Sequence, residues 1–219
     1  MTTVLDVGAF VLARVGRMDT WKLQKLVYYS QAWHAALFDT PLFDDPIQAW
    51  PDGPVAPALW SKHRGKRMVD SVVGADPSSL HNQQALLVDL VCHHYGRLSG
   101  AELSLLTHNE NPWIDAREGL KAKESSRRPI KVSAMADFYR SRELDGRSVI
   151  NLISGGLWPT PAPDGDELLE RDLAEIRQSF EGSGADKPLA DSYSAQFASP
   201  PRSASTPRER YALRPSRSE

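Results

Sequence analysis

The sequence predicts a mainly α fold: a compact multi-helix single domain over residues 1–181, with a short extended segment near residues 47–50 and a disordered C-terminal tail over residues 182–219. Apolar residues recur at helical spacing through most of the first 181 residues. Prolines and aspartates interrupt that pattern around residues 41–54. The tail contains eight Ser, six Ala and five Pro. It has too few large apolar side chains to offset the entropy of ordering.

Two helices are predicted at the N-terminus. The first covers residues 4–15, where valines fall at helical spacing, and Gly16 ends it. The second begins at a cap formed by Asp19 or Thr20. Its buried stripe is expected to contain Leu23, Leu26, Val27, Ser30, Trp33 and Leu37. Off that stripe, and expected to face water, are Lys22, Lys25 and Gln31.

The segment after the second helix is irregular. Pro41 and the cluster Asp44-Asp45-Pro46 are expected to end the helix. Residues 47–50 should be extended, because Trp50 precedes a proline and a residue in that position avoids the α region. Gly53-Pro54 indicates a tight turn. A helix over residues 55–63 follows, with a proline in its first turn.

The next helices are predicted mainly from their ends. Residues 80–95 read as a helix that Gly96 closes. Ser99 and Glu102 form a capping box that opens a helix to about residue 107. Pro112 suits the first turn of a short piece that carries Trp113.

The last third of the chain gives weaker patterns. Residues 119–129 are charged and predict a surface loop, after which Ser133 is expected to cap a helix through residue 139. The apolar run 149–158 contains two adjacent glycines and suits either a frayed helix or a packed loop. Residues 166–180 have the spacing of a final amphipathic helix.

Bulk properties narrow the function. The chain has 219 residues and a net charge of −2, so it lacks the general basicity that drives phosphate binding. The tail carries five Arg and one Lys against two Asp and two Glu, which leaves −4 on the residues before it. One cysteine excludes an internal disulfide and suits a reducing compartment. No window is apolar over the length that an export signal or a membrane span needs, so we expect a cytoplasmic protein.

No metal, cofactor or catalytic array is predicted. Cys92, His93 and His94 are adjacent, and neighbouring helix positions point about 100° apart, so the three cannot converge on one metal ion. His34 lacks the nucleophile and orienting carboxylate of a His-based site. Adjacent Asp44 and Asp45 favour a turn over a catalytic pair. The basic segments 62–67 and 121–131 favour solvated loops over an anion-binding surface.

Aromatic residues are concentrated between Trp21 and Trp60, a stretch that holds four of the six tryptophans. Tyr28 and Trp33 lie five helix positions apart, which separates them by about 140° around the axis. One set of aromatics therefore packs inward. The other either meets a neighbouring helix or forms a recognition surface, and core packing is the favoured interpretation.

An ordered set of motifs resembles the Panacea domain family, which contains SocA-like and GepA-like antitoxins of bacteria and phages. The resemblance covers about residues 4–139. Its motifs are Lys22-Leu23-Gln24-Lys25-Leu26, Tyr28-Tyr29, Gln31, Trp33-His34, Pro41-Leu42-Phe43, Ile47, Ala49-Trp50, Gly53-Pro54-Val55, Asn111-Pro112-Trp113 and Ala116-Arg117. Pro51 and Asp52 are less usual between the tryptophan and the glycine.

The resemblance implies an antitoxin that neutralises its cognate toxin by direct protein–protein binding. In the SocA branch it also implies a proteolytic adapter that delivers the toxin to the ClpXP protease. No catalytic residue or cofactor comes with the family. We expect a few aromatic anchors to dominate such an interface, provided that they are exposed. The candidate partner-binding residues are Tyr28, Trp33, His34, Trp50, Pro54 and Trp60.

Two other functions stay open at this stage. One is a small hydrolase built on His34 or His93, which requires a pocket where a histidine meets a carboxylate and a nucleophile. The other is a DNA-binding autoregulator that uses the basic loops, although a nucleic-acid partner is disfavoured by the net charge.

Overall fold

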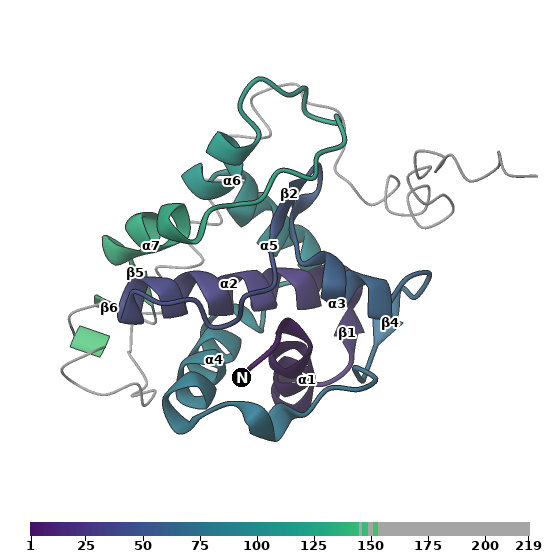
Figure 1. The fold of residues 1–219 in the computed structure, drawn as a ribbon, viewed down its shortest axis with the longest axis vertical. Helices are drawn as coiled ribbons and strands as arrows, with labels where there is room; N and C mark the ends of the chain where they lie inside the picture. The colour runs from purple at the N-terminus through teal and green to yellow at the C-terminus, as the bar shows by residue number, and fades with distance from the viewer. Residues whose placement is uncertain (145, 149–150, 153–219) are drawn as a thin grey trace, which may run out of the picture.

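Helix α2 (Thr20–Phe38) runs through the middle of the fold, and helices α1, α4, α5 and α7 pack directly against it (Figure 1). The computed structural model describes residues 1–144, 146–148 and 151–152. The other helices are α1 (Val4–Val15), α3 (Pro57–Lys62), α4 (Asn82–Tyr95), α5 (Gly100–His108), α6 (Asn111–Ala116) and α7 (Val132–Arg140), with a 3-10 turn at Pro77–Ser79. The predicted mainly helical fold is confirmed.

Three two-stranded antiparallel ladders connect the helices. In the first, β1 (Met18–Asp19) pairs with β4 (Met68–Val69). In the second, β2 (Gln48–Trp50) pairs with β3 (Gly53–Val55), which forms a hairpin. In the third, β5 (Glu143–Leu144) pairs with β6 (Arg147–Ser148). Only the extended segment at 47–50 was predicted, because the partners of the two-residue strands are fixed by tertiary contacts that leave no local pattern.

The helix starts follow local capping chemistry. Asp19 accepts a hydrogen bond from the backbone N–H of Lys22 at 2.8 Å, as predicted for the start of α2. Ser99 and Glu102 form the predicted capping box at the start of α5. Pro57 occupies the first turn of α3, where its missing N–H costs nothing.

Three predicted boundaries were wrong. Helix α2 ends at Phe38, because the next residue, Asp39, adopts a left-handed conformation (φ 56°), so the helix stops before Pro41. The residue before α7 is Lys131, with no side-chain cap, and Ser133 lies inside the helix. The turn of the hairpin is Pro51-Asp52, because Gly53 and Pro54 already pair with β2.

The expectation that the polar residues of α2 face water was also wrong. Lys25 and Gln31 are 0% and 1% exposed, and Lys22 is half-buried, with its ammonium donating to the carbonyl of Gly96. Because α2 has neighbours on every side, its polar positions satisfy backbone groups of the surrounding loops instead of water. Gln31 shows this: its Oε1 accepts from the N–H of Leu42 at 2.7 Å and its Nε2 donates to the carbonyl of Phe43 at 2.9 Å.

Some expectations fall outside the described residues. They are the tail after residue 181, the helix over residues 166–180 and most of the apolar run 149–158. None of the helices in the described part of the chain combines the length and apolar character that crossing a membrane would require.

Candidate functional site

The predicted anchors on α2 are core residues. Tyr28 and Trp33 are both 0% exposed, and the indole N–H of Trp33 donates to the hydroxyl of Tyr95 at 3.2 Å. The ring of Trp33 lies 5.1 Å from that of Tyr139 on α7. The favoured interpretation, core packing, is therefore what the structure shows for both residues. Neither presents a ring to a partner in this conformation.

A cluster of tyrosines surrounds one carboxyl group at the centre of the molecule. Glu110, the residue before α6, accepts hydrogen bonds from Tyr28 at 3.3 Å, Tyr29 at 3.1 Å and Tyr139 at 2.6 Å. Tyr29 also stacks on Tyr95 at 4.0 Å. The burial of its carboxyl group raises the pKa of Glu110 to about 7, although the tyrosine hydroxyls lower it. The cluster joins α2, α4, α6 and α7 into one core.

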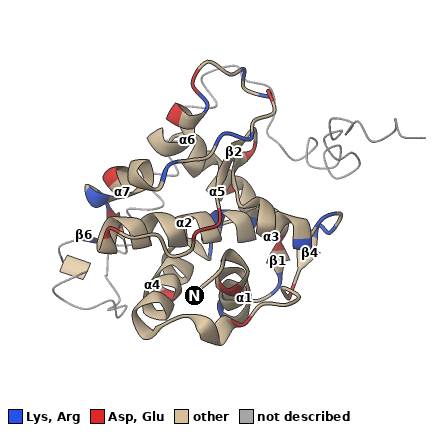
Figure 2. Ribbon diagram, viewed as in Figure 1, with Lys and Arg blue, Asp and Glu red and all other residues tan. Residues whose placement is uncertain are grey.

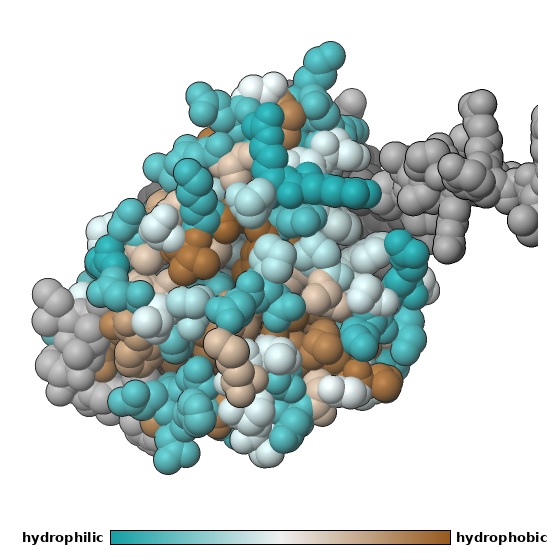
Figure 3. Space-filling model, viewed as in Figure 1, coloured by the Kyte–Doolittle hydropathy of each residue, from teal (hydrophilic) through white to brown (hydrophobic). Residues whose placement is uncertain are grey.

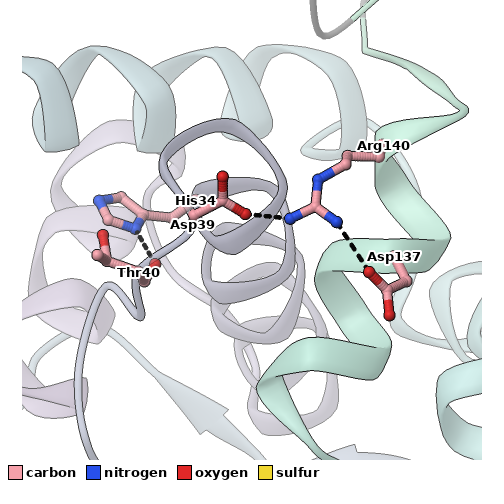
Figure 4. A network of polar contacts seen from close by, with 5 residues as sticks. All are labelled: His34, Asp39, Thr40, Asp137 and Arg140. Carbon is pink, nitrogen blue, oxygen red and sulfur yellow. Dashed lines mark hydrogen bonds and ion pairs between the residues drawn. The ribbon is translucent and has the colours of Figure 1, made fainter.

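His34 has structural contacts at the C-terminal end of α2. Its Nδ1 lies 2.8 Å from the carbonyl oxygen of Thr40 (Figure 4). Its ring lies 4.8 Å from that of Phe38. Burial lowers its pKa. The neighbouring carboxylate of Asp39 is directed to Arg140 on α7, which also bonds to Asp137 at 2.8 Å (Figure 4). These contacts hold the end of α2 to α7, and they do not assemble the nucleophile and carboxylate of a hydrolase around His34.

The three residues of the Cys-His-His motif have different surroundings. Cys92 is buried, and this burial raises its pKa to about 12. His93 is exposed, and His94 packs edge-on against Tyr95 at 4.6 Å. Across the residues that the structure describes, no three His, Cys, Asp or Glu side chains are placed to hold a metal ion.

Side chains of α2 hold one side of the β2–β3 hairpin in place. Nζ of Lys25 donates to the carbonyl of Pro54 at 3.3 Å and lies 5.0 Å from the centre of the Trp21 ring. Burial lowers the pKa of Lys25 to about 7. The amide oxygen of Gln24 accepts from the N–H of Ala56 at 2.8 Å. Two polar residues of the predicted Lys-Leu-Gln-Lys-Leu motif therefore hold the strand that contains the Gly-Pro-Val motif.

Gly53 allows this close approach. Its φ is +102°, a conformation that glycine adopts without strain. A Cβ at this position would lie 2.8 Å from Nζ of Lys25 and 2.9 Å from Oγ1 of Thr107. Pro54 is buried against the same helix. Pro54, a predicted partner-binding residue, is therefore covered in this structure.

The hairpin is fixed from the other side by α6. The indole of Trp113 donates to the carbonyl of Trp50 at 2.9 Å, and the guanidinium of Arg117 donates to the carbonyl of Ala49 at 2.9 Å. Arg117 also donates to the carbonyls of Lys121, Ala122 and Glu124. One buried cation therefore holds both β2 and the loop that follows α6. The ring of His108 stacks on Trp113 at 4.2 Å, and burial lowers the pKa of His108 to about 3.

Trp50 and Trp60 lie on the outer side of this fixed hairpin. Both are half-buried, and their rings meet edge to face at 5.4 Å. The guanidinium of Arg64 lies over the Trp60 ring, 4.9 Å from its centre. We call Trp50, Trp60 and Arg64 the hairpin surface. Of the six predicted partner-binding residues, Trp50 and Trp60 are the two with substantial solvent exposure.

Sequence reasoning missed the polar residues that build the site: the buried Gln24, Lys25 and Arg117, and Glu110, whose carboxyl group is enclosed by tyrosines. A signal was present, because Gln24, Lys25 and Arg117 belong to the motifs that carried the family resemblance. A polar residue within such a motif can make buried hydrogen bonds as readily as it can face solvent.

Comparison with known families gives a match to part of the chain. Residues 23–114 match the family of SocA-like antitoxins with a Panacea domain. The predicted resemblance is confirmed over these residues. The Panacea match contains nearly all of α2, the whole hairpin, and α3 to α5, together with Trp113; it ends before Arg117 and α7. No curated protein and no solved structure matches the chain.

Proposed function

We propose that this protein is the antitoxin of a bacterial toxin–antitoxin pair and that it neutralises its cognate toxin by direct binding. The observation that carries the proposal is the match of residues 23–114 to the SocA-like Panacea domain. This family supports a toxin–antitoxin role. The contacts within the matched region also favour a binding role, because they hold a surface in place and do not bring reactive groups together.

The hairpin surface is our proposed contact with the toxin. Its two tryptophans are large, amphipathic and partly exposed, which are the properties of residues that dominate binding energy at interfaces. The backbone beneath them is held by Lys25, Trp113 and Arg117, so little conformational freedom is lost on binding. In this proposal the buried candidates Tyr28, Trp33, His34 and Pro54 act by supporting that frame.

Co-expression with the product of the adjacent gene tests the function. The wild-type chain should relieve the growth arrest that this product causes, and the two purified proteins should form a complex. Trp60→Ala should weaken the complex by about tenfold or more, as for an interface anchor. Ile114→Ala is a matched control, because Ile114 is an apolar residue with 44% exposure that lies outside the hairpin surface. A wild-type chain that neither binds the product nor restores growth would contradict the proposal.

Delivery of the toxin to ClpXP is a second step that we propose for this protein. The segment 182–219 is our candidate for the element that engages the protease, since its composition, rich in Ser, Ala, Pro and Arg, led us to expect no packed structure there. A chain that ends at Gly182 should bind the toxin with unchanged affinity and should slow toxin degradation in cells that contain ClpXP. Unchanged degradation would remove the segment from the mechanism and leave neutralisation by binding alone.

A further inference from the structure

The turn between α3 and β4 carries a concentrated positive charge. Lys62, Arg64, Lys66 and Arg67 are all exposed within six residues, and Figure 2 shows these blue segments together at the side of the molecule formed by α3 and β4. We call residues 62–67 the basic turn. Within the described part of the chain, no carboxylate lies within ion-pair distance of its four cations. The nearest acidic residue in the sequence, Asp70, accepts a hydrogen bond from Ser71.

The backbone of the basic turn is held in place. The N–H of Lys66 donates to the carbonyl of His63 at 2.9 Å, and Gly65 allows the turn to close with a φ of +77°. His63 is 3% exposed, and its Nε2 lies 3.2 Å from the carbonyl oxygen of Ser71. The carbonyl of Arg67 accepts from the first N–H of α2 at 3.0 Å. The cations therefore project from a fixed loop, which reduces the entropic cost of binding a partner.

Apolar and aromatic groups border the basic turn. Arg64 belongs to both the basic turn and the hairpin surface, because its guanidinium lies over Trp60. On the other side Met68, the first residue of β4, is 40% exposed. Figure 3 shows hydrophilic and apolar side chains next to each other along this side of the molecule. A surface of this kind is complementary to a peptide segment that combines carboxylates with an apolar side chain.

The same charges are less well suited to nucleic acid. Binding to a phosphate backbone requires a basic stripe that follows several phosphates, whereas this cluster is confined to one turn of a chain with a net charge of −2. Base stacking requires an open aromatic face, whereas the Trp60 ring is covered by Arg64 on a face and is in contact with Trp50. The tail 182–219 is itself basic, so it is not a complementary occupant.

We propose that the basic turn receives an acidic segment of the partner toxin, next to the aromatic anchors of the hairpin surface. Carboxylates of that segment pair with Lys62, Arg64 and Lys66, and an apolar side chain packs against Trp60 or Met68. This inference rests on the proposed function and adds the chemistry of the partner's contact.

The test compares two full-length variants with the same change in charge. Lys62→Gln/Arg64→Gln/Lys66→Gln neutralises the basic turn, and Lys121→Gln/Lys123→Gln/Arg127→Gln neutralises three exposed cations of the 121–131 loop. The affinity of each for the purified product of the adjacent gene is measured at 50 mM and 300 mM NaCl. At low salt the first variant should bind about 10- to 100-fold more weakly than the wild type, with a reduced salt dependence, and the control should change by less than about threefold.

The results distinguish the basic-turn proposal from the proposed antitoxin function. If the wild type binds the product and both variants bind it equally well, or both weaken equally, the basic-turn proposal is wrong and the proposed function stands. If the wild type does not bind, both are wrong. A duplex of the upstream promoter is titrated in parallel. Loss of duplex binding by the basic-turn variant, with toxin affinity unchanged, would assign the turn to nucleic acid and overturn the proposal. Thermal unfolding of both variants should match that of the wild type.

Discussion

At the scale of single residues, the side-chain groups of Lys25 and Glu110 are ionisable and enclosed, and they change the stability of the fold with pH in opposite directions. Burial lowers the pKa of Lys25 to about 7 and raises that of Glu110 to about 7. Each group has hydrogen-bond partners inside the fold. Lys25 donates to the carbonyl of Pro54, and Glu110 accepts from three tyrosine hydroxyls. Both hold parts of the fold together, but the shifted pKa values mean that these contacts offset only part of the cost of burying the charge.

Lys25→Met should remove a contribution to the free energy of unfolding that increases as the pH rises above 7. Between pH 7 and 10.5 the unfolded chain binds a proton at Lys25 that the folded chain does not, so the free energy of unfolding rises with pH in this window. Urea unfolding at pH 6.5 and pH 9.5 measures it. The difference in stability between wild type and variant should shift in favour of the wild type at the higher pH. Lys123→Met, at an exposed position, should show no such shift.

Glu110→Gln should change stability in the opposite sense. The raised pKa means that the folded chain keeps a proton which the unfolded chain has released between pH 4.5 and 7, so the contribution of Glu110 to stability falls as pH rises through this window. The variant lacks this fall. Its stability relative to the wild type should therefore improve from pH 4.5 to pH 7.5 in urea unfolding. Parallel curves for the two proteins would show that the carboxyl group titrates normally.

At the scale of elements, the hairpin depends on close contact between β3 and α2. Lys25 approaches the backbone of Gly53 and Pro54 so closely that a Cβ at position 53 would require the Lys25 and Thr107 side chains to shift. The hairpin surface lies directly outside this contact. A change that moves β3 away from α2 therefore also moves Trp50, which faces the Gly53 end of the ladder.

Gly53→Ala should destabilise the protein more than Gly65→Ala. Both glycines have positive φ, so both substitutions carry a backbone cost of about 1–2 kcal/mol. At position 53 the added Cβ also meets Lys25 and Thr107 at less than 3 Å, whereas nothing lies within 4 Å of it at position 65. We expect a further loss of about 1–3 kcal/mol for Gly53→Ala, measured by urea unfolding. Equal losses would mean that the Lys25 side chain moves aside without cost.

The same elements show what could be predicted from the sequence. Helices α1 to α6 were predicted because their signals are local: apolar spacing, the Asp19 cap, the Ser99 capping box and prolines in first turns. The burial of Lys25 and Gln31 could not be predicted in this way. Helical spacing identifies the more apolar face, but it does not show that neighbours cover the other face as well. For the site, the sequence offered four aromatic candidates without showing which are exposed. Trp50 and Trp60 are partly exposed in the structure, and this difference, like the residues that support them, depends on contacts between distant segments.

At the scale of the whole molecule, the core extends beyond the matched domain. The Panacea match ends at residue 114, but α7 packs along α2 and completes the tyrosine cluster through Tyr139. The ion pair between Asp39 and Arg140 joins the same two helices at the surface (Figure 4). The matched segment therefore lacks one of the helices that bury α2, so the residues after it contribute to folding.

This dependence on α7 gives the last prediction. Tyr139 is 1% exposed, and its ring contacts Tyr28, Tyr29 and Trp33. Tyr139→Ala should cost about 3–5 kcal/mol, a large part of the total stability of a typical domain, and should reduce toxin binding only through unfolding. Phe138→Ala, one residue earlier and half-buried, should cost clearly less. Tyr139→Phe isolates the 2.6 Å hydrogen bond to Glu110 and should cost about 1–3 kcal/mol. Urea unfolding of the three variants measures this order, and equal effects of Tyr139→Ala and Phe138→Ala would place α7 outside the cooperative core.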